Sequence, residues 1–104
     1  MDEWPDELKL FAVLSSVKVL LETVSQEEGF GLESSEESLK VINDAIAFFL
    51  EPKQNDFPET LSMYFAPTGL LQEISISNGW SEIYLKLSEQ FDKYEYYLEK
   101  KKAL

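Results

Sequence analysis

The sequence predicts an all-α fold, in which a single domain over residues 1–104 forms a small bundle of four or five helices. Three long segments repeat apolar residues at intervals of three and four positions, which places these residues on one face of an α-helix. Residues typical of helix starts and stops flank the same segments. The length of 104 residues also suits one domain built around one core.

The first predicted helix covers residues 5–24. Pro5 suits the first turn, where a missing backbone N–H costs nothing, and Asp6 and Glu7 complement the positive end of the helix dipole. Residues 26–33 hold two glycines and three acidic residues without any period, so we expect an exposed loop there. The apolar face of the helix comprises Leu10, Val13, Leu14, Val17, Leu21 and Val24.

The second predicted helix begins at Ser34 and ends before Pro52. Ser34 and Glu37 have the spacing of a capping box, in which each side chain accepts a hydrogen bond from the backbone N–H of the other residue. Proline cannot continue a helix, so Pro52 marks its end. The apolar face comprises Leu39, Ile42, Ala45, Ile46 and Phe49.

A short third helix is predicted after the polar residues 51–56. Asp56 and Glu59 repeat the capping-box spacing, and Pro58 is tolerated in a first helical turn. The helix would run to about Phe65, because the residue before Pro67 is forced out of the helical region.

Residues 66–80 are compatible with two structures. A short helix is favoured, with Thr68 as its cap and with Asn78 and Gly79 ending it through a left-handed residue. The alternative is one short β-hairpin near residues 61–77, because residues 74–77 alternate apolar and polar positions like a strand.

The final segment, from Trp80 to the C-terminus, has the clearest helical pattern and predicts one long helix. Glu82 with Lys86, and Glu89 with Lys93, are spaced for ion pairs within the helix. The pattern covers only about two heptads, too few for a coiled coil. Its apolar residues are Tyr84, Leu87, Phe91, Tyr94 and Leu98.

Several functional classes are disfavoured by the residue types that the chain lacks. It contains no cysteine, histidine or arginine, so the commonest metal ligands and general bases and the bidentate phosphate clamp are missing. The acidic residues lack the spacing of a calcium loop, and no local pattern selects two carboxylates for glycoside hydrolysis. We therefore expect no enzyme activity, no cofactor and no metal site.

The location of the chain is expected to be the cytoplasm. A cysteine-free composition fits a reducing compartment, and the acidic start differs from the basic start of a secretory signal. The longest mainly apolar stretch, residues 8–21, is interrupted by polar residues and is shorter than the roughly 20 residues that cross a bilayer. We expect no membrane association.

The charge is strongly acidic and unevenly distributed. Twenty acidic residues and nine lysines give a net charge of −11, most of it within residues 1–60. Such a field repels phosphate, so nucleic-acid binding is not expected. Small acidic inhibitors of nucleases, including immunity proteins and nucleic-acid mimics, resemble this chain in size and charge as a class, although no motif identifies a named family. A basic protein partner is therefore the favoured hypothesis.

The predicted partner-binding patch combines five carboxylates with one aromatic ring near the loop of residues 26–33. Phe30 belongs to no apolar stripe and would act as an anchor inside an acidic rim. The patch comprises Glu27, Glu28, Phe30, Glu33, Glu36 and Glu37.

Three alternatives to this patch stay open. The first is a homodimer formed through aromatic residues that one small core does not readily hide. Another is a small carboxylate enzyme or ligand carrier, which a pocket holding an acid of raised pKa would support. In the last, the acidity serves solubility alone. The aromatic residues outside the core stripes are Trp4, Phe30, Tyr64, Trp80, Tyr96 and Tyr97, with the adjacent Tyr96 and Tyr97 expected to point in different directions.

Overall fold

A computed structural model describes residues 4–23, 32–66 and 69–103, with side chains described from residue 35 onward in the second range. Within these ranges the chain is helical and contains no strand, so the predicted all-α fold is confirmed and the hairpin alternative near residues 61–77 is wrong. The described residues form six helices, not the four or five predicted, because the predicted C-terminal helix is divided in two. They are α1 (Asp6–Thr23), α2 (Leu32–Leu50), α3 (Leu61–Tyr64), α4 (Leu70–Ser77), α5 (Ser81–Tyr94) and α6 (Tyr96–Lys101).

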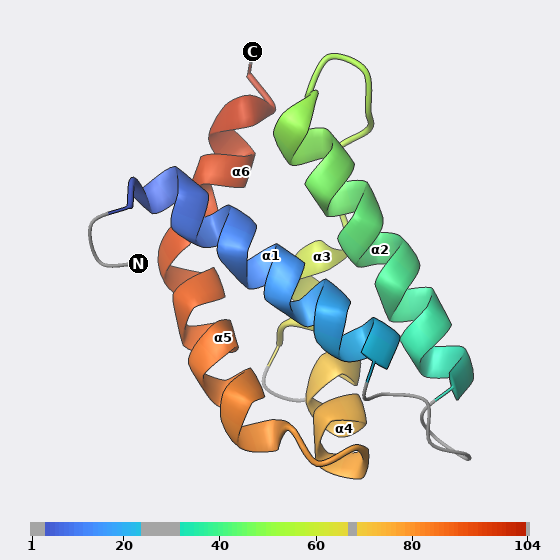
Figure 1. The fold of residues 1–104 in the computed structure, drawn as a ribbon. Helices are drawn as coiled ribbons and strands as arrows, with labels where there is room; N and C mark the ends of the chain where they lie inside the picture. Colours follow the sequence, from blue (N-terminus) through green and yellow to red (C-terminus); the bar gives the residue numbers. More distant parts are fainter. Residues whose placement is uncertain (1–3, 24–31, 67–68, 104) are drawn as a thin grey trace.

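The helices pack around α1, which contacts α2 on one side and α5 on the other (Figure 1). Helices α3 and α4 contact each other and α2, and α4 also contacts α5. This arrangement gives a radius of gyration of 13.2 Å, close to the roughly 13 Å expected for a compact chain of this length.

Helix α1 begins and faces the core as predicted. The carbonyl oxygen of Pro5 accepts hydrogen bonds from the backbone N–H groups of Leu8 at 2.9 Å and Lys9 at 3.2 Å, so the first turn forms directly after the proline. Val24 lies outside the described residues. The other five predicted positions are fully buried, namely Leu10, Val13, Leu14, Val17 and Leu21.

Helix α2 begins two residues earlier than predicted, at Leu32. Ser34 therefore already lies inside the helix and cannot be its N-cap, since an N-cap residue has non-helical backbone angles. The predicted capping box of Ser34 and Glu37 is wrong. At the other end, the Asn55 side chain donates hydrogen bonds to the carbonyl oxygens of Ala47 and Glu51, both at 3.1 Å, and these bonds satisfy the last turns of the helix.

The third helix is shorter than predicted. Helix α3 begins at Leu61, and Thr60 at its N-cap position makes no side-chain capping hydrogen bond. Residues 56–58 are not helical, because Pro58 disfavours the helical region for Phe57. The capping box of Asp56 and Glu59 is therefore wrong.

Helix α4 confirms the favoured interpretation of residues 66–80. Gly79 has a φ of +82°, the left-handed conformation predicted for the helix end. The backbone N–H of Trp80 donates to the carbonyl of Ser75 at 2.9 Å, which completes the termination. The predicted cap Thr68 lies outside the described residues, and Gly69 occupies the N-cap position.

The predicted C-terminal helix is divided at Glu95 into α5 and α6. The Glu95 carbonyl accepts a short i→i+3 hydrogen bond from the backbone N–H of Leu98 at 2.9 Å, which tightens the helix at this point. Neither ion pair predicted for this helix, Glu82 with Lys86 or Glu89 with Lys93, is present. The Lys93 ammonium instead lies 5.3 Å from the centre of the Tyr94 ring. The predicted apolar face is otherwise confirmed, with Leu87 half-buried and Tyr84, Phe91, Tyr94 and Leu98 buried.

An aromatic cluster joins the end of α3 to α5. The Phe65 ring stacks on Phe91 with ring centres 3.9 Å apart, and Trp80 meets Tyr84 edge to face at 6.1 Å. Trp80 is buried, so this residue belongs to the core and not to a surface aromatic group. The cluster fixes α3 against α5 and thereby positions the two surface pockets on either side of α3.

Candidate functional site

The predicted partner-binding patch falls largely in parts of the chain that the structure leaves undescribed. Glu27, Glu28 and Phe30 lie outside the described residues, and Glu33 lies in α2 without a described side chain. The two remaining members, Glu36 and Glu37, are exposed on the N-terminal half of α2. That all six residues form one surface patch therefore stays a prediction.

Glu37 makes a tertiary contact that joins α2 to α3. The Tyr64 hydroxyl donates a hydrogen bond of 3.0 Å to Glu37 Oε1, across 27 positions of sequence. Partial burial of the ring, together with this bond and the negative carboxylate, raises the pKa of Tyr64. Tyr64 therefore stays a neutral donor at physiological pH, and it holds the Glu37 carboxylate beside α3.

An apolar pocket, called here the α3/α4 pocket, adjoins that contact. Its volume is about 490 Å³, and its walls are formed by Met63, Tyr64, Ala66, Gly69 and Leu70. Met63 is 67% exposed at its edge. Because Tyr64 both lines the pocket and binds Glu37, the acidic part of α2 borders an apolar hollow.

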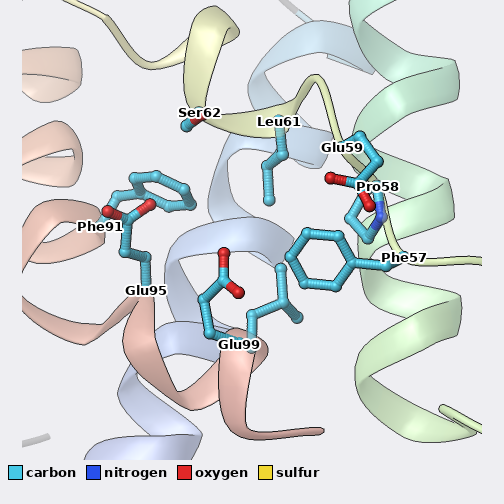
Figure 2. A pocket seen from close by; sticks show the side chains of 9 residues that line it. Phe57, Pro58, Glu59, Leu61, Ser62, Phe91, Glu95 and Glu99 are labelled. Atoms are coloured by element: carbon cyan, nitrogen blue, oxygen red, sulfur yellow. The ribbon is translucent and has the colours of Figure 1, made fainter. Parts of the chain in front are cut away.

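A second pocket, called the α3/α6 pocket, lies on the other side of α3 and has a volume of about 250 Å³. Figure 2 shows the Glu99 carboxylate in the space between Phe91 and Phe57, with the Glu95 carboxylate beside Phe91 and Glu59 on the opposite side. The buried side chains of Leu61 and Leu98 contribute to the apolar lining.

No described lysine neutralises all three carboxylates of the α3/α6 pocket. Burial raises the pKa of Glu95, and the neighbouring negative charges of Asp92 and Glu99 raise it further. A cation entering the pocket would relieve this repulsion. Among the described side chains, only Glu59 of the three pocket carboxylates forms an ion pair, with Lys102 at 3.5 Å.

At the edge of the α3/α6 pocket, the ammonium group of Lys102 contacts both an aromatic ring and a carboxylate. Its Nζ atom lies 4.3 Å from the centre of the Phe57 ring while it pairs with Glu59. An aromatic face combined with a carboxylate is a favourable environment for an organic cation. Lys101 is held in a similar way, 2.5 Å from Glu7 and 4.6 Å from the centre of the Phe49 ring.

Most lysines of the chain are engaged internally. Among the described residues, four of the nine lysines form ion pairs and two more lie over tyrosine rings. These contacts neutralise few of the twenty acidic residues. The exposed Glu37 carboxylate, which binds the Tyr64 hydroxyl at the α3/α4 pocket, forms no ion pair with a described lysine.

Neither a metal-binding cluster nor a membrane-spanning helix is found among the described residues. Within residues 4–23, 32–66 and 69–103, no three acidic side chains lie close enough together to hold a metal ion. No described helix combines the length and the apolar character needed to span a bilayer.

The aromatic residues at the C-terminal end differ from the prediction. Tyr96 and Tyr97 do not point apart, because their ring centres are only 4.1 Å from each other. Both side chains bend toward the same space, where the Lys100 ammonium lies over the two rings. The two rings and the lysine therefore form one local cluster, in which Tyr96 is still 45% exposed.

Sequence reasoning missed the residues that form the α3/α4 pocket. Met63, Gly69 and Leu70 carry no motif, and Tyr64 was recognised only as an aromatic residue outside the core stripes. The one available signal was Pro67, which separates two short helices and so indicates a turn between them. Comparisons of this chain with protein-family models, with curated proteins and with solved structures found no match.

Proposed function

We propose that this chain is a non-catalytic interaction domain that binds a basic surface of a partner protein. The observation that carries this proposal is the hydrogen bond between Tyr64 and Glu37, which holds an exposed carboxylate at the rim of the apolar α3/α4 pocket. An apolar hollow within an acidic rim is complementary to an apolar side chain flanked by lysine or arginine residues.

The dimensions and the charge of this surface both suit a protein partner. A volume of about 490 Å³ lies within the range of pockets that accept a large side chain or a small ligand. The net charge of −11 would attract a basic partner from a distance and accelerate association. The pocket would then contribute most of the affinity, because rim charges mainly affect the association rate.

The class of partner follows from the same chemistry. A basic groove that normally binds phosphate presents the lysine and arginine side chains that Glu36 and Glu37 would contact. We therefore propose an inhibitor or immunity-like role, in which the acidic surface covers such a groove on an enzyme and keeps its substrate out.

The test compares two pairs of charge reversals in a binding assay with the partner that the wild-type chain captures. Glu36→Lys with Glu37→Lys changes the acidic rim, whereas Glu51→Lys with Asp92→Lys makes the same change in net charge at exposed positions outside the lining of the α3/α4 pocket. We expect the first pair to weaken equilibrium binding about tenfold or more. The second pair should mainly slow association.

Equal losses in the two double variants would mean that only the overall charge matters, and unchanged binding in both would exclude this surface. Met63→Ala tests the apolar part, with Leu50→Ala as its control because both side chains are strongly exposed. Circular dichroism and urea unfolding would show that each variant remains folded.

A second candidate function is suggested by the α3/α6 pocket, namely the binding of a small organic cation. The specific observation is Glu95, whose pKa is raised inside a pocket that also contains Phe57. The contact of Lys102 with Phe57 and Glu59 illustrates the same recognition of an ammonium group.

Calorimetric titration with a linear aliphatic diamine tests this second candidate. Binding of the cation should lower the raised pKa of Glu95, and it should weaken in Glu95→Gln. Glu89→Gln on the same helix is the matched control. Absence of heat at millimolar diamine, or equal binding by both variants, would reject the pocket as a cation site.

A further inference from the structure

A shallow groove runs between α1 and α5, away from the residues of the proposed partner surface. Two adjacent hollows of about 410 and 240 Å³ make up this groove, and they share Ser16 and Ile83. We call them together the α1/α5 groove. The packing of α1 against α5 forms its base (Figure 1).

Apolar side chains stand exposed along the groove. Val19 on α1 is 55% exposed and Ile83 on α5 is 52% exposed, while Leu20 packs partly against the core. Burial of such side chains against another protein surface would remove apolar area from water, which is favourable. The small residues Ala12 and Ser16 leave space for side chains of an opposing helix.

The charges around the groove are unusual for this chain. Among the described residues that line the two hollows there is no carboxylate, and Lys86 is the single ionic residue. Glu82 and Glu89 lie about one turn before and after Lys86 on α5, and both are exposed. The face therefore combines a cation with nearby carboxylates, whereas the molecule as a whole is strongly acidic.

This charge pattern is complementary to itself. In a two-fold symmetric interface the same patch meets its own copy, so Lys86 of one chain can face a carboxylate of the other chain and the reverse. A strongly basic partner would find no carboxylate among the described residues of the groove, and a strongly acidic one would meet Glu82 and Glu89 at its edge. A second copy of this chain fits both conditions.

We propose that the α1/α5 groove is the interface of a homodimer, in which Val19 and Ile83 of each copy pack into the groove of the other. The groove shares no lining residue with the α3/α4 pocket. A dimer would therefore present two copies of the partner surface, and its formation does not depend on the proposed function.

Salt should affect this dimer and partner binding in opposite directions. Each copy carries a net charge of −11, so the two copies repel at long range while the apolar groove attracts at contact. Added salt screens that repulsion over distances beyond about 8 Å at physiological ionic strength. Dimerisation should strengthen as salt rises, whereas binding of a basic partner should weaken.

Sedimentation velocity of the full chain over a micromolar to millimolar concentration series provides the test. The wild type should approach twice its monomer mass of 12.0 kDa, at lower concentration in higher salt. Ile83→Asp and Val19→Asp should each raise the dimer dissociation constant about tenfold or more, since both copies carry the change. Leu85→Asp is the matched control, because Leu85 is 54% exposed on the same helix and lies outside the groove.

A further variant, Lys86→Glu, changes an exposed charge and so tests the interface even if an aspartate variant fails to fold. It should also weaken the dimer. A wild type that stays monomeric throughout the series would overturn the proposal. A dimer that Leu85→Asp weakens as much as Ile83→Asp would also overturn it. The same holds for a dimer that stays intact in all three groove variants, Val19→Asp, Ile83→Asp and Lys86→Glu.

Discussion

The substitution Gly69→Ala should destabilise the fold more than any other glycine-to-alanine change in the described residues. Gly69 precedes α4, where the chain passes close to the backbone of α3. An added Cβ atom would lie 2.5 Å from the carbonyl oxygen of Met63 and 2.8 Å from that of Tyr64. Ordinary van der Waals contact begins at about 3.4 Å, so α3 and α4 would have to separate.

The size of the effect follows from what the methyl group meets. Overpacking typically costs about 1–3 kcal/mol, and backbone atoms yield less than flexible side chains do. Replacement of glycine also lowers the conformational entropy of the unfolded chain, which offsets about 0.4–1 kcal/mol of this cost. We therefore expect a net loss of about 2 kcal/mol, or a fall in Tm of roughly 8–16 °C for a domain of this size.

Urea unfolding monitored by tryptophan fluorescence would measure this loss, with Gly79→Ala as the comparison. Gly79 has open space around its missing Cβ but a φ of +82°, so its cost comes from backbone strain alone and should be about 1 kcal/mol. If Gly69→Ala proved no more destabilising than Gly79→Ala, the close approach of α3 and α4 would be refuted. The shape of the α3/α4 pocket would then need revision as well.

Three other changes test features of the same fold. Asn55→Ala removes two hydrogen bonds to the last turns of α2 and should cost about 1 kcal/mol in urea unfolding; an unchanged midpoint would contradict this role. The buried Tyr84 hydroxyl has no partner among the described residues, so Tyr84→Phe should be neutral or slightly stabilising at pH 7. Burial raises the pKa of Tyr84 to about 12, so the folded state keeps a proton that the unfolded state releases near pH 10. The free energy of unfolding should therefore fall between pH 10 and pH 12. This fall should be less steep in Tyr84→Phe than in the wild type. Burial and like charges raise the pKa of Glu95, so Glu95→Gln should stabilise the fold at pH 7. This gain should disappear at pH values where the carboxyl is protonated in both the folded and the unfolded state. Destabilisation at pH 7 would contradict the repulsion among the pocket carboxylates.

The sequence by itself determined the helical class and the faces of the long helices. In α1 every predicted core position within the described residues is buried, and in α5 the same holds for Tyr84, Phe91 and Tyr94. The reason is that apolar burial dominates the folding free energy and its period follows directly from helix geometry. Gly79 was predictable too, because only a residue without a Cβ adopts a left-handed backbone at low cost.

Local signals were less reliable where they competed with neighbouring structure. Both predicted capping boxes failed, one because α2 extends beyond Ser34 and the other because Pro58 keeps its surroundings out of a helix. A cap contributes only about 1 kcal/mol. Packing of the adjacent apolar residues easily outweighs that amount.

The candidate surfaces were decided by tertiary structure alone. Glu37 and Tyr64 are separated by 27 positions, and Ser16 and Ile83 come from helices at opposite ends of the chain. Charge and composition could indicate an acidic interaction protein, but they could not place a carboxylate at the rim of a pocket. Proximity of that kind arises only when distant helices pack, because helix periodicity determines which face a residue occupies and packing determines what that face meets.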